Sequence, residues 1–285
     1  MAKRFTFVPQ NPSPARAAVV ACLFSALLLT GCTTKEEREA AEVAKEKQVA
    51  VEILYNKARE TLEEGEYFKA ALRFDDVDRQ YPYSQWATRA QLMSGYAHYK
   101  NLKYPEAVLA LDRFIELHPG DQNIAYAYYL RALCYYEQIS DVRRDQRMTQ
   151  LALDNLRQVV ERYPDSKYAR DAALKIDLTQ DHLAGKEMEI GRYYLERRQY
   201  HAAIPRFQRV LDNYQTTTHV PEALHRMTEA YLSLGLKDEA QKTAAILGHN
   251  YPQSVWYKDS FRLFNKDYKE GAEPSMYERT IGKIF

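Results

Sequence analysis

The feature that most constrains the fold is a recurring stop, at which an amphipathic segment ends in a proline or a polar turn. Such a segment precedes Pro82, Pro119, Pro164 and Pro252, and Gln215 in "DNYQ" fills the remaining place. The stops are 37, 45, 51 and 37 residues apart. Proline cannot continue a helix, and it displaces the residue before it from helical conformation, so each stop marks a helix end. Repeats of this length predict stacked helix pairs.

A second regularity lies inside each repeat. Twelve residues before each stop stands an alanine, namely Ala70, Ala107, Ala152, Ala203 and Ala240. Eight residues before each stop stand Phe74, Leu111, Leu156, Phe207 and Ala244. This alternation of small and large positions resembles the tetratricopeptide repeat. We therefore predict an all-α, right-handed superhelical solenoid of five helix pairs, from Val49 to Trp256.

Two repeats depart from the regular length. Eight extra residues fall between the helices of the third unit, within "QISDVRRDQRM". The fourth interval is long because residues 167–198 can form one extended helix. Residues 32–48, rich in Ala, Glu and Lys, form a spacer that is either a disordered tether or an extension of the first helix. Residues 257–285 keep no repeat register and are predicted to be a short helix and a mobile tail.

The first 31 residues are predicted to be a lipoprotein signal peptide. A basic start precedes the apolar run "AAVVACLFSALLL", which is too short to span a bilayer. The run ends in "LTGC", which resembles the bacterial lipobox and implies cleavage before Cys32 and lipidation of that cysteine. Thr33 follows in place of the aspartate that retains lipoproteins at the inner membrane. We therefore expect a lipid-anchored protein on the periplasmic face of the outer membrane.

The composition gives no sign of chemistry or of nucleic-acid binding. Forty basic and 39 acidic residues give a net charge of +1, without the basic excess of a nucleic-acid binder. There is no HExxH pair, CxxC pair, phosphate-binding glycine loop or GxSxG motif. Cys134 is expected to be a buried, inert thiol. We predict no enzyme activity, no metal and no cofactor.

The repeat family binds its ligands along the first helix of each unit. Carrying the family's positions onto this chain gives a peptide-binding groove of Tyr55, Arg59, Tyr96, Tyr99, Lys100, Tyr126, Tyr129 and Tyr136. Aromatic faces with cations nearby would suit a peptide that carries aromatic residues and a negative end. The alternative is that these tyrosines only fill the space between helices. The charged loop at Arg144 and Asp145 is either a solvated loop or a partner contact braced by internal Asp–Arg pairing.

Several segments together resemble the BamD family, lipoproteins of the β-barrel assembly machinery of the bacterial outer membrane. They are Asp112 to Ile115 with Pro119 and "NI" at 123–124, the Arg144-Asp145-Gln146 loop, and "RYPDSKYARDA" from Arg162 to Ala172. The resemblance implies that the protein binds the barrel-forming subunit BamA, other lipoproteins of the machinery and unfolded outer-membrane proteins, without covalent chemistry. It also implies that Arg206 forms an ion pair with BamA.

Two other functions remain open on the sequence. The first is a repeat lipoprotein that coordinates envelope or peptidoglycan machinery, similar to the CpoB family, which also ends its repeats in Tyr-Pro-x-Ser. The short spacer and the lipobox count against it. The second is an envelope enzyme that uses the solenoid as a scaffold, which no motif supports.

Overall fold

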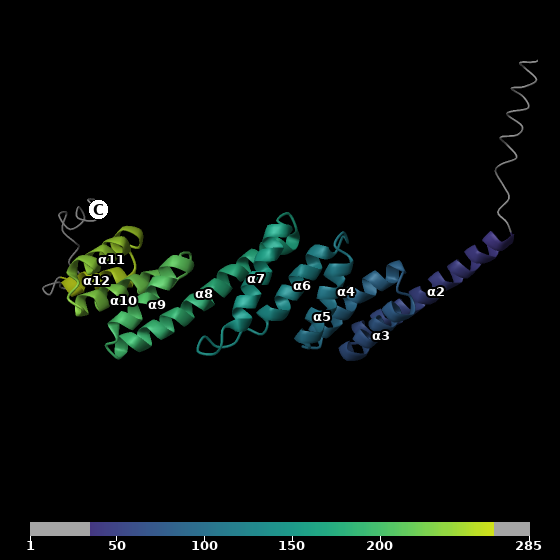
Figure 1. The fold of residues 1–285 in the computed structure, drawn as a ribbon, viewed down its shortest axis with the longest axis horizontal. Coiled ribbons are helices and arrows are strands. Elements are labelled where there is room, and N and C mark those ends of the chain that lie inside the picture. Colours follow the sequence, from purple (N-terminus) through teal and green to yellow (C-terminus); the bar gives the residue numbers. More distant parts are fainter. Residues whose placement is uncertain (1–34, 265–285) are drawn as a thin grey trace, which may run out of the picture.

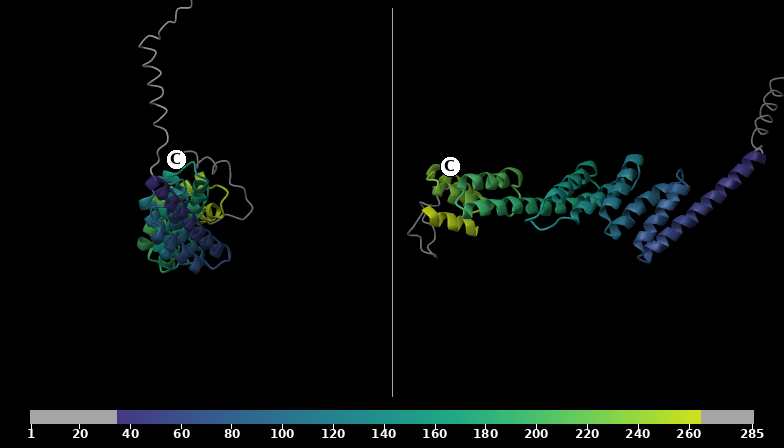
Figure 2. Two further views of the ribbon diagram at one scale, coloured as in Figure 1. Left: turned by 90° about the vertical axis from the view of Figure 1, so that its right-hand side faces the viewer. Right: turned by 60° about the horizontal axis from the view of Figure 1, so that its bottom comes forward.

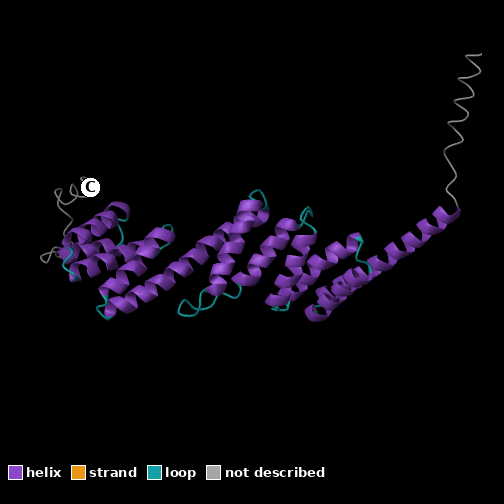
Figure 3. Cartoon of the chain, viewed as in Figure 1, coloured by secondary structure: helices purple, strands orange, loops and turns teal. Residues whose placement is uncertain are grey.

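A computed structural model describes residues 35–264 of the chain. Eleven helices and no strand are found within this range, stacked into an elongated rod (Figures 1 and 3). The helices are α2 (Lys35–Glu63), α3 (Tyr67–Gln80), α4 (Gln85–Lys100), α5 (Tyr104–Leu117), α6 (Ile124–Tyr136), α7 (Arg147–Arg162), α8 (Lys167–Glu196), α9 (Tyr200–Asn213), α10 (Val220–Ser233), α11 (Lys237–Asn250) and α12 (Val255–Phe264). The pairs α2/α3, α4/α5, α6/α7, α8/α9 and α10/α11 confirm the helical repeat solenoid of five units.

The recurring Tyr-Pro-x-Ser phrase is both a stop and a start. The tyrosine caps the finished helix, as at Tyr81, whose N–H donates to the carbonyl of Val77 at 3.0 Å. Proline then prevents further helix, and the serine caps the next one. Ser84 Oγ accepts from the N–H of Ala87 at 3.1 Å, and Ser166 and Ser254 repeat the bond at the starts of α8 and α12. The phrase therefore marks the beginnings of α4, α8 and α12.

The small residues let paired helices approach closely. The five alanines at the first repeat position are fully buried, as are Phe74, Leu111, Leu156 and Phe207 at the second. At Gly95 a Cβ would lie 2.8 Å from Leu111 Cγ, and at Gly191 it would lie 2.3 Å from Phe207 Cε1. In these two units the large side chain of the second helix thus occupies the space that a glycine leaves on the first helix.

Helix α8 is the extended helix that the long fourth interval predicts, with 30 residues. Its first half packs on α6 and α7 as the opening helix of a new unit would, and its second half packs on α9 and α10 (Figure 1). No second helix covers the first half, and Leu174 and Leu178 there are 62% and 61% exposed. Helix α8 therefore joins two first helices end to end.

The two ends of the solenoid add to the sequence interpretation. The spacer is helical from Lys35 onward, as an extension of the first helix. The short helix predicted after Trp256 is α12, which begins at Val255 and packs on α10 and α11, with Ser260 buried. Tyr257 lies against Gly248, where a Cβ would be 2.6 Å from its ring. The signal segment, Cys32 and residues 265–285 lie outside the described residues. None of the described helices has the length and apolarity to cross a membrane.

Replacing the glycine between α8 and α9 should destabilise the fold. In Gly191→Ala the new Cβ would overlap the ring of Phe207, which is fully buried and has no room to move. Overpacking of this kind costs about 1–3 kcal/mol, which exceeds the gain of about 1 kcal/mol from the helix propensity of alanine. We expect a lower free energy of unfolding in urea, followed by circular dichroism.

Gly120→Ala is the control, because no atom lies within 4 Å of the added Cβ. It should change the free energy of unfolding by less than about 0.5 kcal/mol. The variant Phe207→Leu should recover stability in the Gly191→Ala background, because it removes the ring atoms that clash. Equal stability of Gly191→Ala and the parent protein would contradict the proposed close contact.

Candidate functional site

The first helices of the units form one continuous side of the solenoid. Helix α2 contacts α4, α4 contacts α6, α6 contacts α8, and α8 contacts α10. No two of the second helices α3, α5, α7, α9 and α11 touch each other. In a curved stack the closer-spaced elements lie inside, so the first helices line the inner side. Figure 2 shows this stack from two further directions.

A cluster of tyrosines lies where α4, α6 and α8 adjoin. The rings of Tyr126 and Tyr129 on α6 each lie 5.3 Å from the ring of Tyr168 on α8. Tyr96 and Tyr99 on α4 pack against the same core. All five side chains are only partly buried. Each ring therefore contributes to the core and also keeps an exposed edge, so the packing and binding interpretations of the tyrosines are compatible.

An acid and a base on α8 complete this cluster. The hydroxyl of Tyr129 donates to the carboxylate of Asp171, and Lys175 Nζ lies 3.2 Å from Asp171 Oδ2. Lys175 also lies over the ring of Tyr136, 5.2 Å from its centre. The hydrogen bond from Tyr129, reinforced by Lys175, lowers the pKa of Asp171. Asp171 is therefore an ionised carboxylate at neutral pH, held between a phenol and an ammonium group.

Burial dominates the electrostatics of the tyrosines. It raises the pKa of Tyr99 to about 12, with Glu137 adding to the effect, and raises the pKa values of Tyr126 and Tyr129 further. These phenols stay protonated at any physiological pH. They can therefore donate hydrogen bonds and offer neutral aromatic faces.

Three residues expected in the groove have other neighbours. Tyr55 packs inside the first unit, with its ring 5.5 Å from Phe74 and 4.8 Å from Trp86. Arg59 pairs with Glu63 at 3.5 Å in an exposed contact on its own helix. Lys100 lies over the ring of Tyr67, 5.7 Å from its centre. The cations at the tyrosine cluster are Lys175 and Lys167, which lies over the ring of Tyr168 at 5.1 Å, whereas Arg59 and Lys100 contact the groups named above.

The sequence analysis missed Tyr168, Asp171 and Lys175, although a signal for them exists. Ser166 ends the phrase Tyr163-Pro164-Asp165-Ser166, and Ser84 at the end of the same phrase begins a first helix. The same phrase at Ser166 therefore indicates that Lys167 begins another first helix, which places these three residues on the inner side.

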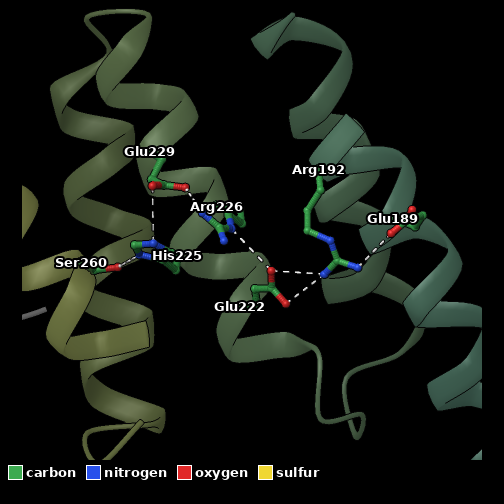
Figure 4. Close-up of polar contacts among 7 residues, drawn as sticks. All are labelled: Glu189, Arg192, Glu222, His225, Arg226, Glu229 and Ser260. Carbon is green, nitrogen blue, oxygen red and sulfur yellow. Dashed lines mark hydrogen bonds and ion pairs between the residues drawn. The ribbon is translucent and has the colours of Figure 1, made fainter. Parts of the chain in front are cut away.

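The C-terminal half carries a chain of charged contacts instead of tyrosines (Figure 4). Arg192 on α8 lies 3.3 Å from Glu189 and 3.1 Å from Glu222 on α10. Arg226 lies 3.4 Å from Glu222 and 2.8 Å from Glu229. The spacing of three and four residues places Glu222, Arg226 and Glu229 on one face of α10. The chain of ion pairs therefore links α8 to α10 along their adjoining faces.

His225 extends this chain to the last helix. Its Nδ1 lies 2.8 Å from Ser260 Oγ on α12, and its Nε2 lies 3.6 Å from Glu229 (Figure 4). The ring of Trp256 lies 5.4 Å from the imidazole, and the guanidinium of Arg226 lies over the same Trp256 ring, 5.2 Å from its centre. Burial lowers the pKa of His225, although Glu229 opposes the effect. Beside these charges lies a cavity of about 280 Å³, lined by Arg192, Leu195, Glu196, Tyr200, Arg226, Glu229 and Ser233.

Arg206, expected to form an ion pair with BamA, already forms an ion pair within the protein. Its guanidinium lies 3.2 Å from Glu187 on α8, and its side chain is 29% exposed. Arg209 lies 3.5 Å from the same carboxylate and is 53% exposed. Arg206 therefore already pairs across the α8–α9 contact, and any external partner would have to share or replace Glu187.

The loop of the third unit is braced in a different way from the one expected. The amide of Gln146 donates to the backbone carbonyls of Asp141, Val142 and Arg144, at 3.3, 3.2 and 3.0 Å. Asp141 accepts the backbone N–H of Arg143 at 2.8 Å. No ion pair joins the Asp and Arg side chains within this described loop. Arg144 and Asp145 are exposed, just before α7 begins.

No metal site is found among residues 35–264. No group of three His, Cys, Asp or Glu residues in this range could hold a metal ion. Cys134 is fully buried, and burial raises the pKa of its thiol to about 12. The nucleophilic thiolate is therefore suppressed at neutral pH.

Comparisons with known proteins agree on one family. The model of a family described as YfiO, outer membrane lipoprotein, matches residues 47–247. A protein of Caulobacter vibrioides named outer membrane protein assembly factor BamD is 46% identical over 275 residues, covering 94% of this chain and 89% of that protein. The proteins of the same name from Rickettsia prowazekii and Neisseria meningitidis serogroup B are 46% and 33% identical, covering 85% and 83% of this chain and 94% and 92% of theirs. Among solved structures, the P58(IPK) TPR domain is 16% identical over 90% of this chain and 76% of its own, with a TM-score of 0.39.

The lowered pKa of His225 predicts an acid-sensitive fold. Free imidazole of an unfolded chain takes up protons near its ordinary pKa of 6.5, whereas the buried ring resists protonation. Stability from this group is therefore complete above pH 6.5 and is lost as the pH falls below it toward the lowered folded value. The loss should reach at most about 1.4 kcal/mol per pH unit, measured by urea unfolding between pH 7.5 and 5.

His225→Gln should flatten this pH dependence because it removes the titrating group. The exposed His201 is the control, and His201→Gln should leave the pH profile unchanged. If His225→Gln keeps the full acid-induced loss, another group is responsible.

Proposed function

The chain belongs to the family of outer membrane lipoproteins that includes the BamD assembly factors, and we propose that it acts as an assembly factor for outer-membrane proteins. It would bind BamA and other lipoproteins of the assembly machinery, and receive unfolded outer-membrane proteins. The observation that carries the proposal is the family match over most of the chain. The partly exposed tyrosine cluster on the inner side supplies a surface suited to unfolded chains. This function requires no covalent chemistry.

The proposed anchor is a lipid on Cys32, which holds the protein on the periplasmic face of the outer membrane. The support is the apolar run and the lipobox in the sequence, because Cys32 lies outside the described residues. Acyl chains on one cysteine anchor stably, since each buried methylene contributes about 0.8 kcal/mol.

Cys32→Ser should therefore abolish lipidation and release the protein from the membrane. The measurement is fractionation after carbonate washing, with mass spectrometry of the N-terminal peptide. Retention of the serine variant in the washed membrane would show that lipid is not the main tether.

The proposed substrate site is the tyrosine cluster of Tyr96, Tyr99, Tyr126 and Tyr129. The proposed ligand is the C-terminal segment of an unfolded outer-membrane protein. If this segment is extended and has alternating aromatic residues, its rings would pack on the exposed edges of the tyrosines. Lys175 is the cation that supports recognition of the terminal carboxylate, in competition with Asp171. Each aromatic pair contributes about 0.5–1.5 kcal/mol beyond area burial. Affinity for one peptide should thus be modest, as transfer to the next component requires.

The function is tested by titrating such a C-terminal peptide against the full mature chain. Tyr96→Ala/Tyr129→Ala should weaken binding about tenfold, because the loss of two aromatic contacts corresponds to about 1.4 kcal/mol or more. Tyr83→Ala and Tyr193→Ala are controls, because these tyrosines are 101% and 50% exposed and lie outside the cluster.

Circular dichroism must show that the double variant is folded, because both rings also pack in the core. If the double variant is not folded, the peptide affinity of Lys175→Gln is the test of the site, because this change removes the cation and leaves the rings in place. Unchanged affinity in the folded variants would place the substrate elsewhere.

The proposed contact with BamA involves Arg206, and the exposed part of the loop at Arg144 and Asp145 is a further partner contact. Arg206→Glu should weaken co-purification with BamA through charge reversal. Arg209→Glu is a matched control, because Arg209 is on the same helix and pairs with the same Glu187. Both variants lose one internal ion pair, so only a loss specific to Arg206→Glu assigns this residue to the interface. Equal co-purification of the two variants with BamA would show that Arg206 is not part of the interface.

A further inference from the structure

The solenoid consists of two halves that share one helix. Helices α2–α7 form the first half and α9–α12 the second, and no described helix of one half contacts a helix of the other. Helix α8 runs between them for about 45 Å, at 1.5 Å per residue. In Figure 1 it is the only helix that bridges the stacks. A single helix of this length would allow the halves to bend and rotate about it.

Two loops meet on α8 at the point where the halves join. The strut loop, residues 137–146, belongs to the first half and connects α6 to α7. The α9–α10 loop, residues 214–219, belongs to the second half. A Cβ at Gly185 would lie 3.4 Å from Val142 of the strut loop and 3.3 Å from His219 of the α9–α10 loop. The two loops therefore close on one backbone position of α8, which a glycine occupies.

Polar contacts tie each loop to the same two turns of α8. From the strut loop, Arg143 Nε lies 3.1 Å from Glu189, and the carbonyl of Arg143 accepts Lys186 Nζ at 3.0 Å. From the other loop, the N–H and hydroxyl of Thr218 donate to Asp181 at 3.1 and 2.8 Å. The side chain of Glu189 continues through Arg192 to Glu222 on α10 (Figure 4). The first half is thus tied through the strut loop to the core of the second.

We propose that the strut loop and the α9–α10 loop form a joint around Gly185 that fixes the orientation of the two halves. Gly185 is the positioning residue, because a Cβ there would already be at contact distance from Val142 and His219, and a bulky side chain would push both loops away from α8. The eight residues inserted in the third unit supply the length with which the strut loop reaches α8. The insertion is therefore a structural brace as well as an exposed loop.

The joint has a consequence that rests on the proposed function. The tyrosine cluster is centred on the first half and Arg206 is in the second, so the joint sets the geometry in which substrate and BamA are held together. Arg144 and Asp145 are exposed residues of the strut loop, next to Arg143, so a partner that binds them would act directly on the joint.

The test measures distances between the halves in the full mature chain, without substrate or BamA. Spin labels at Leu109→Cys on α5 and Gln241→Cys on α11 report across the joint, and labels at His201→Cys and Gln241→Cys report within the second half. Gly185→Leu should shift or broaden the first distance distribution and leave the second unchanged. Arg143→Ala/Lys186→Ala should also broaden the first distribution, because it removes the ties of the strut loop without altering the core.

Ala173→Leu is the control for an added leucine on α8, because Ala173 is exposed and distant in sequence from the joint. It should leave both distributions as in the parent protein. If Gly185→Leu does not fold, the Arg143/Lys186 variant alone decides. An unchanged distribution across the halves in the folded variants overturns the joint. Because no partner is present in the experiment, this outcome is independent of the proposed assembly function.

Discussion

The solenoid depends on one kind of contact, in which a large side chain of a second helix fills the space left by a small residue on its first helix. Leu111 against Gly95 and Phe207 against Gly191 show it most closely. The contact fixes the distance between paired helices, and so fixes how the next pair can stack. Because each unit contacts only its neighbours, a change at one such contact alters the position of every unit beyond it. The binding surfaces are therefore set by buried positions that touch no ligand.

The first half of helix α8 lacks this contact between a small residue and a large side chain. It begins as a first helix, capped by Ser166, but Asp177 stands eleven residues after the cap, where α4 has Gly95. Without a small residue there, no second helix packs closely on this half, and the chain continues as one helix to the next unit. As a result, the helices on the two sides of this junction, α2–α7 and α9–α12, make no direct contact with each other. The inserted loop of the third unit lies at this junction and supplies contacts that the missing helix would otherwise have made.

The local signals predicted the fold well, and the side-chain partners much less well. Helix ends follow from Pro82, Pro164 and Pro252, because the proline constraint acts within a few residues. The pairing of Arg206 with Glu187 could not be predicted in the same way, because the two residues lie on different helices, 19 positions apart, and their meeting depends on helix rotation. The same holds for Tyr129 and Asp171, which are 42 positions apart. Packing of α12 on α10 was missed because the sequence after Trp256 has no repeat register, although Ser254 caps this helix as Ser84 caps α4 and Ser166 caps α8.

In the tyrosine cluster, core packing and the proposed recognition of substrate need not compete. A tyrosine ring that is packed on one side has already lost its rotational freedom on folding, so a ligand that stacks on the other edge pays little further entropy. Tyr126, Tyr129 and Tyr168 hold each other at ring distances of 5.3 Å, and Asp171 fixes the hydroxyl of Tyr129. An unfolded chain offers many weak aromatic contacts and no fixed shape. A preorganised aromatic surface gains affinity from such a chain without requiring a defined sequence, which is the property that an assembly factor for many substrates needs.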